Sequence, residues 1–475
     1  MFIAGKWEEA AGGRRFDVTN PANGEVLADV PDGGAQDAAR AIDAAFDAFP
    51  GWAGATAYDR SRALFKAWQI MMERKEELAL TMTREQGKPI RAARNEVQYA
   101  ADFLQWYSEE AKRVYGATIP SARADQRFIT LRQPVGVVAA ITPWNYPVSM
   151  ITRKLAPALA AGCTLVLKPA EATPLCAVEM FKIFEEAGFP PGVVNLVTAG
   201  DPAPIGEEFV SNRKVAKLTF TGSTPVGKML AGRAAAEMKR VSCELGGHAP
   251  FLVFGDADPV HAAKGAQLVK FLNTGQACIS PNRMLVQRAL VDDFVGTLSE
   301  RVGSMKAGNG LEDGITIGPL VNQAAVDKVA AQVEDAAAKG AEIVCGGKRL
   351  TDGGLDKGFF YAPTVLAGVT PEMRIYREET FGPVAPVIAF DDDDEALAMA
   401  NDTHYGLAAY VYTQNNSRAM RMFEGLNFGI IGINDINPTS AAAPFGGMND
   451  SGLGREGGRD GIDEYLETKL GGFSI

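Results

Sequence analysis

The chain has 475 residues, of which 47% are hydrophobic, and a formal net charge of −11 at pH 7. At roughly 150 residues per domain, this length predicts about three domains around a large buried core. The negative charge without basic runs argues against a nucleic-acid partner, and the lack of an apolar stretch of about 18 residues or a signal-peptide core predicts a cytoplasmic protein without a membrane partner.

Short apolar runs alternate with helical spacing through the middle of the chain. In chain order, the pattern predicts a strand at 135–141, a helix at 147–161, a strand at 164–167, a helix at 174–188, strands at 193–197 and 215–220, a helix at 224–238, and strands at 240–243 and 251–254. A β-α-β-α series of this kind predicts an α/β fold with a doubly wound parallel sheet. Such sheets bind ligands at the carboxyl ends of their strands.

Three loops that follow predicted strands have residues suited to ligand chemistry, and each has a plainer interpretation. The loop Thr221-Gly-Ser-Thr224 opens a helix with small residues, which suits a pyrophosphate but is equally an ordinary N-cap. Lys168 and Glu171 are suited to ribose hydroxyls, although such residues in a turn are more often just solvated. The Asn145 amide is suited to an oxyanion, or it caps the helix that follows.

A thiol and a carboxylate are the candidate catalytic groups. Five cysteines, at 163, 176, 243, 278 and 345, fit neither a disulfide framework nor metal spacing, so we expect reduced thiols and no metal site. Cys163, Cys176 and Cys243 lie in or beside apolar runs and should pack as small hydrophobic residues. Cys278 lies in a predicted loop, and a lone loop cysteine is more often structural than catalytic. Glu244 is set among small residues 34 positions earlier, which favours covalent catalysis.

The segment Gly452-Leu-Gly-Arg-Glu-Gly457 matches the dinucleotide pattern G-x-G-x-x-G. No predicted strand precedes it and no βαβ unit contains it, so it fails the context that this motif requires. We interpret it as a loop. The nearby segment Pro444-Phe-Gly-Gly447 also predicts irregular backbone close to a functional surface.

Taken together, the motifs resemble those of the NAD(P)-dependent aldehyde dehydrogenase superfamily over nearly the whole chain. The matching segments, in the family's order and spacing, are Pro143-Trp-Asn-Tyr-Pro147, Lys168-Pro-Ala-Glu171, Phe220-Thr-Gly-Ser-Thr224, Glu244-Leu-Gly-Gly247, Gly275-Gln-Ala-Cys278, Glu379-Thr-Phe-Gly-Pro383 and Pro444-Phe-Gly-Gly447. The resemblance implies the aldehyde dehydrogenase fold, with a doubly wound cofactor domain, an α/β catalytic domain and a β oligomerisation arm.

By this resemblance, Cys278 is the nucleophile that attacks the aldehyde, and Glu244 is the base that activates the water releasing the acid. The Asn145 amide and the Cys278 N–H would hold the oxyanion, each donor being worth about 10²–10³ in rate. The residues that the family uses for the cofactor match Thr142, Pro143, Trp144, Lys168, Glu171, Gly222, Ser223, Gly246, Glu379 and Phe381.

The resemblance also implies domain boundaries. Residues 1–112 and 134–246 would form the NAD(P)-binding domain, and residues 247–459 the catalytic domain. Residues 113–133 and 460–475 would form the arm that joins subunits into a homodimer or homotetramer. Alternation in Arg127-Phe-Ile-Thr-Leu-Arg132 predicts an exposed strand there, and a lone hairpin needs a partner to be stable.

The substrate pocket is assigned from helical spacing and from a narrower resemblance. Tyr146, Met150 and Arg153 follow i, i+4, i+7 spacing and share one helix face. The matching arginine of succinate-semialdehyde dehydrogenase-like proteins binds the substrate carboxylate, whereas the plainer interpretation is an arginine in a structural salt bridge. We assign Leu272, Thr439 and Phe445 to the same pocket.

Two positions of this chain depart from the pattern of succinate-semialdehyde dehydrogenase-like proteins. Leu272 stands where the group usually has a second arginine, which admits a longer or more apolar aldehyde. Ser280 stands where the group often has a second cysteine, so no disulfide with Cys278 is expected.

Glu171 should accept hydrogen bonds from the adenosine ribose and repel a 2′-phosphate, which predicts a preference for NAD with NADP as a possible cofactor.

Other classes of function are alternatives to an aldehyde dehydrogenase. A cysteine hydrolase needs a histidine base, and His248, His261 and His404 lie in no recognisable Cys-His signature. A noncatalytic binding protein should have lost one of the three catalytic candidates, and all three are present. A coenzyme A-acylating relative would normally lack the base at Glu244. A dehydrogenase of neutral aliphatic or aromatic aldehydes is the main alternative for the substrate.

Overall fold

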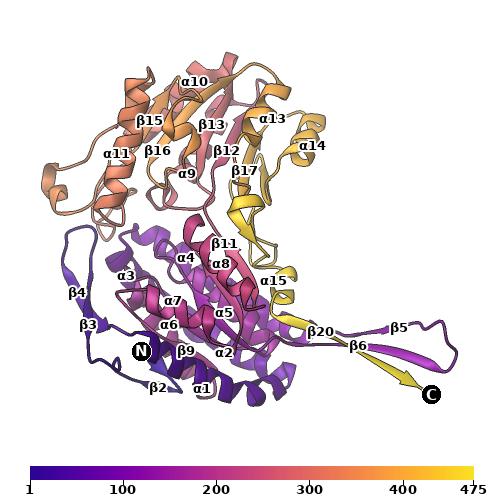
Figure 1. The fold of residues 1–475 in the computed structure, drawn as a ribbon. Helices are drawn as coiled ribbons and strands as arrows, with labels where there is room; N and C mark the ends of the chain where they lie inside the picture. The colour runs from indigo at the N-terminus through magenta and orange to yellow at the C-terminus, as the bar shows by residue number, and fades with distance from the viewer.

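The chain folds into two large sheets, each flanked by helices on both faces, and a narrow three-stranded sheet that projects from them (Figure 1). This computed structural model describes residues 1–475. No helix is both long and apolar enough to span a membrane.

The first sheet has eight strands in the order β19-β11-β10-β7-β8-β9-β1-β2. The strands from β11 to β9 pair in parallel, and antiparallel strands close both edges. The bounds are β1 (Phe2–Ile3), β2 (Lys6–Trp7), β7 (Val137–Ile141), β8 (Thr164–Lys168), β9 (Val194–Leu196), β10 (Val215–Thr221), β11 (Arg240–Glu244) and β19 (Gly452–Leu453).

Residues that alternate along β7 face two different cores, as both faces of a covered parallel sheet require. Val138 and Ala140 pack on the face covered by helices α2 to α6, whereas Val137 and Ala139 pack on the face covered by α1, α7 and α8. The bounds are α1 (Ala35–Gly54), α2 (Ala57–Glu73), α3 (Lys75–Gln86), α4 (Ile90–Glu110), α5 (Ser149–Ala161), α6 (Pro174–Ala187), α7 (Ala203–Ser211) and α8 (Thr224–Ala236).

The second sheet has seven strands in the order β14-β15-β16-β13-β12-β17-β18, all parallel except the edge strand β14. Their bounds are β12 (Ala249–Val253), β13 (Pro281–Gln287), β14 (Glu342–Cys345), β15 (Thr364–Ala367), β16 (Val384–Phe390), β17 (Ala408–Tyr412) and β18 (Ile430–Ile433). Helices α9 (Pro259–Lys270) and α10 (Val291–Gly303) cover one face. Helices α11 (Gln323–Ala338), α12 (Arg374–Arg377), α13 (Asp393–Asn401) and α14 (Asn416–Gly425) cover the other.

The arm is the antiparallel sheet β20-β6-β5, which extends away from both large sheets and carries the C-terminus near its tip (Figure 1). Its strands are β5 (Ala117–Ile119), β6 (Gln126–Pro134) and β20 (Leu466–Ser474), and the short helix α15 (Asp460–Asp463) precedes β20. Burial alternates along β6, as the sequence predicted for an exposed strand. A separate hairpin joins β3 (Arg15–Thr19) and β4 (Val26–Pro31).

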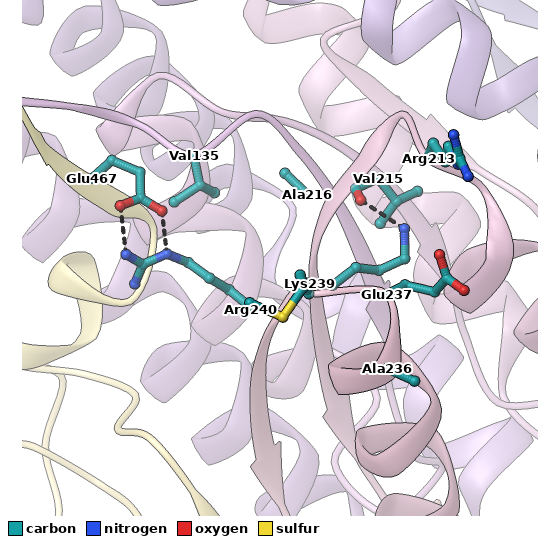
Figure 2. A pocket seen from close by; sticks show the side chains of 10 residues that line it. Val135, Arg213, Val215, Ala216, Ala236, Glu237, Lys239, Arg240 and Glu467 are labelled. Carbon is teal, nitrogen blue, oxygen red and sulfur yellow. Dashed lines mark hydrogen bonds and ion pairs between the residues drawn. The ribbon is translucent and has the colours of Figure 1, made fainter.

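A cavity of about 550 Å³ lies at the base of the arm, beside the amino ends of β10 and β11 (Figure 2). The Arg240 guanidinium on β11 forms a two-pronged ion pair with Glu467 on β20, at 2.5 and 2.7 Å. The Lys239 ammonium donates instead to the backbone carbonyls of Asn212 and Val215. No candidate catalytic residue lines this cavity. It lies where the ion pair between Arg240 and Glu467 connects the arm to the first sheet.

The nine elements predicted from the sequence are all present, with ends shifted by one or two residues. One interpretation was wrong. Gly452 and Leu453 form the edge strand β19, paired antiparallel with Glu244 and Cys243, where we expected only a loop. Two residues are too short a run for periodicity to reveal, and this strand exists only because the edge of β11 is available to pair with it.

Candidate active site

The candidate site lies between the two sheets, where the carboxyl ends of the first sheet face the amino ends of the second. In the first sheet the strand order reverses between β7 and β10, and such a switch point opens a crevice for ligands. The loop after β7 begins at Thr142 and the loop after β10 at Gly222. Cys278 lies in the loop that leads into β13 of the second sheet.

Two cavities meet at the Cys278 thiol. The first, of about 250 Å³, is lined by Pro143, Trp144, Asn145, Met150, Thr221, Gly222, Ser223, Leu245, Gly246, Cys278, Lys328, Glu379 and Phe381. The second, of about 260 Å³, is lined by Ala92, Asn95, Glu96, Tyr99, Tyr146, Ser149, Met150, Arg153, Leu272, Ala277, Cys278, Ile279, Asn437, Thr439 and Phe445. Cys278 and Met150 line both, so one thiol is reachable from two separate ligand-sized spaces.

The backbone before Cys278 follows a left-handed path. Asn273 and Thr274, in the short helical turn η2 (Leu272–Gly275), have φ values of +49° and +60°, and Gly275 follows at +76°. A Cβ added to Gly275 would lie 2.1 Å from the Gly382 carbonyl oxygen. Glycine is therefore required there for two reasons, the backbone conformation and the lack of space.

The Cys278 side chain is half-buried and makes no disulfide. Burial raises the pKa of its thiol to about 12; Arg153 lowers this value, while the carboxylates of Glu244 and Glu379 add to the rise. The thiol is thus protonated at neutral pH in the ligand-free protein. Of the other four cysteines, Cys163, Cys176 and Cys243 are buried among apolar residues, as their sequence context predicted.

Asn145 is buried and bonded directly to the nucleophile loop. The Asn145 side-chain amide donates to the backbone carbonyl of Gln276 at 3.0 Å. The backbone carbonyl of Asn145 accepts from the side-chain amide of Asn273 at 2.9 Å. It does not cap helix α5, which begins after Val148. The plainer interpretation of Asn145 as a helix cap is therefore wrong, and its carboxamide lines the first cavity beside Cys278.

Glu244 is the last residue of β11, and it lines neither cavity. Both oxygens are buried without a hydrogen-bond partner, and a Cβ at Gly446 would lie 3.0 Å from one of them. Burial raises the pKa of Glu244 well above its usual range, and the negative charge of Glu456 adds to the rise, while Arg153 and Lys154 oppose it. Glu244 is close enough to influence Cys278 electrostatically, but its carboxylate does not line the space next to the thiol.

The first cavity fits a dinucleotide at its glycines and at a helix N-terminus. Ser223 occupies the N-cap position of α8 without a side-chain cap bond, which leaves the first N–H groups of that helix available to an anion. A Cβ at Gly246 would lie 2.9 Å from a Glu379 carboxylate oxygen, so a larger residue there would force the Glu379 side chain to move. Trp144 and Phe381 meet edge to face, with ring centroids 5.7 Å apart.

Seven of the ten predicted cofactor residues line this cavity, and Thr142, Lys168 and Glu171 do not. These three lie at the neighbouring strand end, where Thr142 N–H donates to the Lys168 carbonyl at 3.2 Å. Lys168 is buried rather than solvated, and its ammonium binds the Glu171 carboxylate, which is partly exposed. A dinucleotide that extends from the cavity along the carboxyl ends of the strands would reach this pair.

All six predicted substrate residues line the second cavity. Arg153 is fully buried, with Nη2 2.9 Å from Glu456 Oε2 and Cζ 3.8 Å from the centre of the Phe445 ring. Neither Nε nor Nη2 has a hydrogen bond of good geometry. Arg153 is therefore in an ion pair, as the plainer interpretation expected, and it also lines the substrate cavity with Nε unpartnered.

Sequence reasoning missed the contribution of helix α4. Its residues Asn95, Glu96 and Tyr99 line the second cavity. Their i, i+1 and i+4 spacing was visible, but nothing in the local pattern shows that α4 packs beside α5. None of the three histidines lines either cavity, which removes the base that a cysteine hydrolase would need.

Comparisons with known proteins agree with this geometry. The profile of the aldehyde dehydrogenase family matches residues 7–470. A succinate-semialdehyde dehydrogenase [NADP(+)] of Escherichia coli is 49% identical over 98% of this chain and 96% of its own, and a glutarate-semialdehyde dehydrogenase of Pseudomonas putida is 48% identical over 98% and 96%. The solved structure of succinate-semialdehyde dehydrogenase from Burkholderia pseudomallei superposes with a TM-score of 0.98 at 46% identity, covering 100% of this chain and 97% of that one. The chain belongs to the aldehyde dehydrogenase family.

Proposed function

We propose that the protein oxidises an aldehyde bearing an anionic group, most simply a carboxylate as in succinate semialdehyde, to the corresponding acid. The observation that carries this proposal is Arg153, a buried guanidinium in the cavity that also contains the Cys278 thiol; its Nε has no hydrogen-bond partner, and its Nη2 is ion-paired with Glu456. A buried donor without an acceptor is costly, so the cavity favours a ligand that supplies an anion. The names of two relatives, which act on succinate and glutarate semialdehyde, support the same class.

In this proposal the Cys278 sulfur adds to the aldehyde carbon, and the developing oxyanion accepts from the Asn145 amide and the Cys278 N–H. One hydrogen of the Asn145 amide already binds the Gln276 carbonyl, and the second is available to the oxyanion. Burial raises the pKa of the thiol, so its proton must pass to water as the carbon–sulfur bond forms. NAD(P), held by residues of the first cavity, would supply the hydride acceptor, and loss of a hydride from the carbon leaves a thioester on Cys278.

Hydrolysis of the thioester needs a base, and Glu244 is the candidate. Burial raises the pKa of Glu244, which favours uptake of a proton, and no hydrogen bond holds either carboxylate oxygen in its buried position. A turn of the side chain would bring it from its buried position towards the thioester. A water that loses its proton to Glu244 then attacks the thioester carbon and releases the acid with the Cys278 thiol restored.

We also propose that NAD is preferred over NADP. The support is Glu171, whose partly exposed carboxylate follows β8 at the carboxyl edge of the first sheet and would repel a 2′-phosphate bound there, although its ion pair with Lys168 reduces this effect. Relatives from Escherichia coli and Sinorhizobium fredii are named for NADP, so the proposal of an NAD preference rests on Glu171 of this chain alone. Comparing kcat/KM for the two cofactors at fixed aldehyde tests the proposal, and a strong NADP preference would overturn it.

The substrate proposal is tested with succinate semialdehyde and a neutral aldehyde of the same length. Charge-assisted bonds of about 1.5–3 kcal/mol predict that Arg153→Leu lowers kcat/KM for the semialdehyde about 10- to 150-fold more than for the neutral aldehyde. The ratio matters because damage to folding lowers both values equally. Leu272→Arg should lower KM for the semialdehyde, since Leu272 lines the same cavity without a charge. An unchanged ranking in Arg153→Leu would mean that Arg153 is structural and would remove the proposal for an anionic substrate.

A further inference from the structure

A buried ion pair outside the catalytic residues lies directly behind Asn145. Lys88, in the loop between α3 and α4, and Glu96, in α4, have side chains that are 0% and 1% exposed. The Lys88 ammonium binds the Glu96 carboxylate and also donates to the Asn145 carbonyl at 2.8 Å. It lies 4.1 Å from the centre of the Tyr146 ring.

Glu96 supplies the cap that helix α5 lacks. Val148, at the N-cap position, has no polar side chain, so the first N–H groups of α5 need an acceptor from elsewhere. One Glu96 oxygen accepts from the N–H groups of Val148 and Ser149, at 3.0 and 3.2 Å, while the other binds Lys88. A single carboxylate therefore connects the start of α5 to the ammonium that holds Asn145.

The pair connects to the nucleophile loop through Asn145. The Asn145 carbonyl accepts from Lys88 and from Asn273, and the Asn145 side chain donates to Gln276, two residues before the thiol. The position of the Asn145 carboxamide is thus set from two sides. Lys88 holds it from the first sheet's helices, and the loop of the second sheet holds it from the other side.

Stability alone does not explain a charged pair at this depth. Burying two charges is expensive, and a well-packed apolar pair of similar size is often neutral or stabilising in such a place. Burial lowers the pKa of Lys88, and only Glu96 opposes this effect strongly. What an apolar pair would not provide is the charge-assisted donor to Asn145 and the acceptor for α5.

We propose that Lys88 and Glu96 are positioning residues that hold the Asn145 carboxamide where the oxyanion forms. This inference rests on the proposed function, because it gives the pair a role in aldehyde oxidation. The pair does not touch the reacting atoms at Cys278. Its effect passes through the Asn145 backbone, and a misplacement of about 1 Å at a catalytic group can cost about 100-fold in rate.

The test is a double-mutant cycle between the pair and Asn145. The variant Lys88→Met/Glu96→Gln removes both charges together, so no unpaired charge is left buried. Its kcat/KM for the preferred aldehyde should fall at least tenfold in the wild-type background and less than twofold in an Asn145→Ala background. An equal loss in both backgrounds would overturn the inference. Such a result would mean that the pair acts on the fold in general or on the substrate directly, since Glu96 also lines the substrate cavity.

Two further measurements separate positioning from loss of structure. The dissociation constant for NAD, measured by quenching of tryptophan fluorescence, should stay within about twofold of wild type. The matched control is Lys217→Met/Glu464→Gln, which removes a largely buried ion pair of 3.3 Å near the amino end of β10, far from the thiol. This control should leave kcat/KM unchanged in both backgrounds.

If the Lys88→Met/Glu96→Gln variant does not fold, Lys88→Arg is carried through the same cycle. It keeps the charge and changes the geometry of the donor, so the same tenfold and twofold limits decide the outcome. Absence of aldehyde oxidation by the wild-type protein is a separate result, which would overturn the proposed function itself rather than the role of the pair.

Discussion

At the scale of single residues, the two main catalytic candidates share a buried environment that disfavours their charged forms. Burial raises the pKa of the Cys278 thiol and of the Glu244 carboxyl, and each negative charge would disfavour the other. Neither group is therefore strongly reactive in the ligand-free protein. Activation must accompany binding, either through a cation such as the oxidised nicotinamide or through movement of Glu244.

The rate of alkylation of Cys278 as a function of pH should show that the pKa of this thiol is raised. With a pKa of about 12, the thiolate fraction rises about tenfold per pH unit, so the rate of reaction with iodoacetamide should increase log-linearly from pH 7 to pH 10 without a plateau. The measurement is the loss of aldehyde oxidation with time in the ligand-free protein, with Cys278→Ala as the mass-spectrometric control for other cysteines. A plateau below pH 9 would show that the site stabilises the thiolate instead.

Substitution of Glu244 should separate the two halves of the reaction. Glu244→Gln keeps the size of the side chain but cannot accept a proton, so acylation should proceed and hydrolysis should stall. Rapid-mixing experiments should show a burst of about one reduced cofactor per site and then almost no turnover, whereas Cys278→Ala should show neither. Equal loss of burst and turnover in Glu244→Gln would mean that Glu244 also takes the thiol proton.

At the scale of elements, the left-handed turn before Cys278 places the thiol against the second sheet. Asn273, Thr274 and Gly275 all have positive φ, and the Gly275 Cα is held close to the Gly382 carbonyl at the start of β16. The Thr274 hydroxyl of the same turn donates to the Gly318 carbonyl at 3.1 Å. The turn is therefore anchored both to the Gly318 segment and to the loop before β16.

Gly275→Ala should disturb this turn far more than the same change at a comparable glycine elsewhere. Gly353 has a similar φ of +66° but nothing within 4 Å of an added Cβ, so Gly353→Ala isolates the cost of the left-handed backbone, about 1–2 kcal/mol. We expect Gly275→Ala to lower kcat/KM at least tenfold and Gly353→Ala to leave it unchanged. Similar kinetic effects in both variants would argue against a special role for the turn.

At the scale of the whole molecule, the arm presents apolar side chains to solvent. Leu131 on β6 and Leu470 on β20 are 59% and 61% exposed, and both outer strands of the arm have unpaired edges. A three-stranded sheet with so little core of its own is marginal in water unless something covers it. We propose that a second copy of the chain covers it, in a homodimer or homotetramer.

Charges placed on the arm should then weaken the oligomer. Leu131→Lys/Leu470→Lys puts one ammonium group on each face of the arm, so whichever face is covered, the mass measured by light scattering at micromolar concentration should fall to that of a smaller species. Gln133→Lys is the control, because Gln133 is exposed on the same strand but is polar already. A wild-type protein that is monomeric under the same conditions would contradict the proposed role of the arm.

The sequence by itself determined the elements, the fold and the candidate catalytic groups. Apolar runs such as those of β7 and β8 are local patterns, and the spacing of Met150 and Arg153 follows from the helix repeat alone. The family motifs were equally local, because each lies within a single loop. The family and fold expected from them are confirmed, whereas the individual residue roles remain predictions for the experiments above.

Only the tertiary structure decided how these groups meet. The strand β19 exists because the edge of β11 accepts it, and Glu456, which sits 302 residues from Lys154, balances two buried cations beside the site. The pairing of Lys88 with Glu96 and the burial of Glu244 away from both cavities likewise depend on which helices pack together. Burial and charge pairing are properties of contacts between distant segments, and no local pattern of residues contains them.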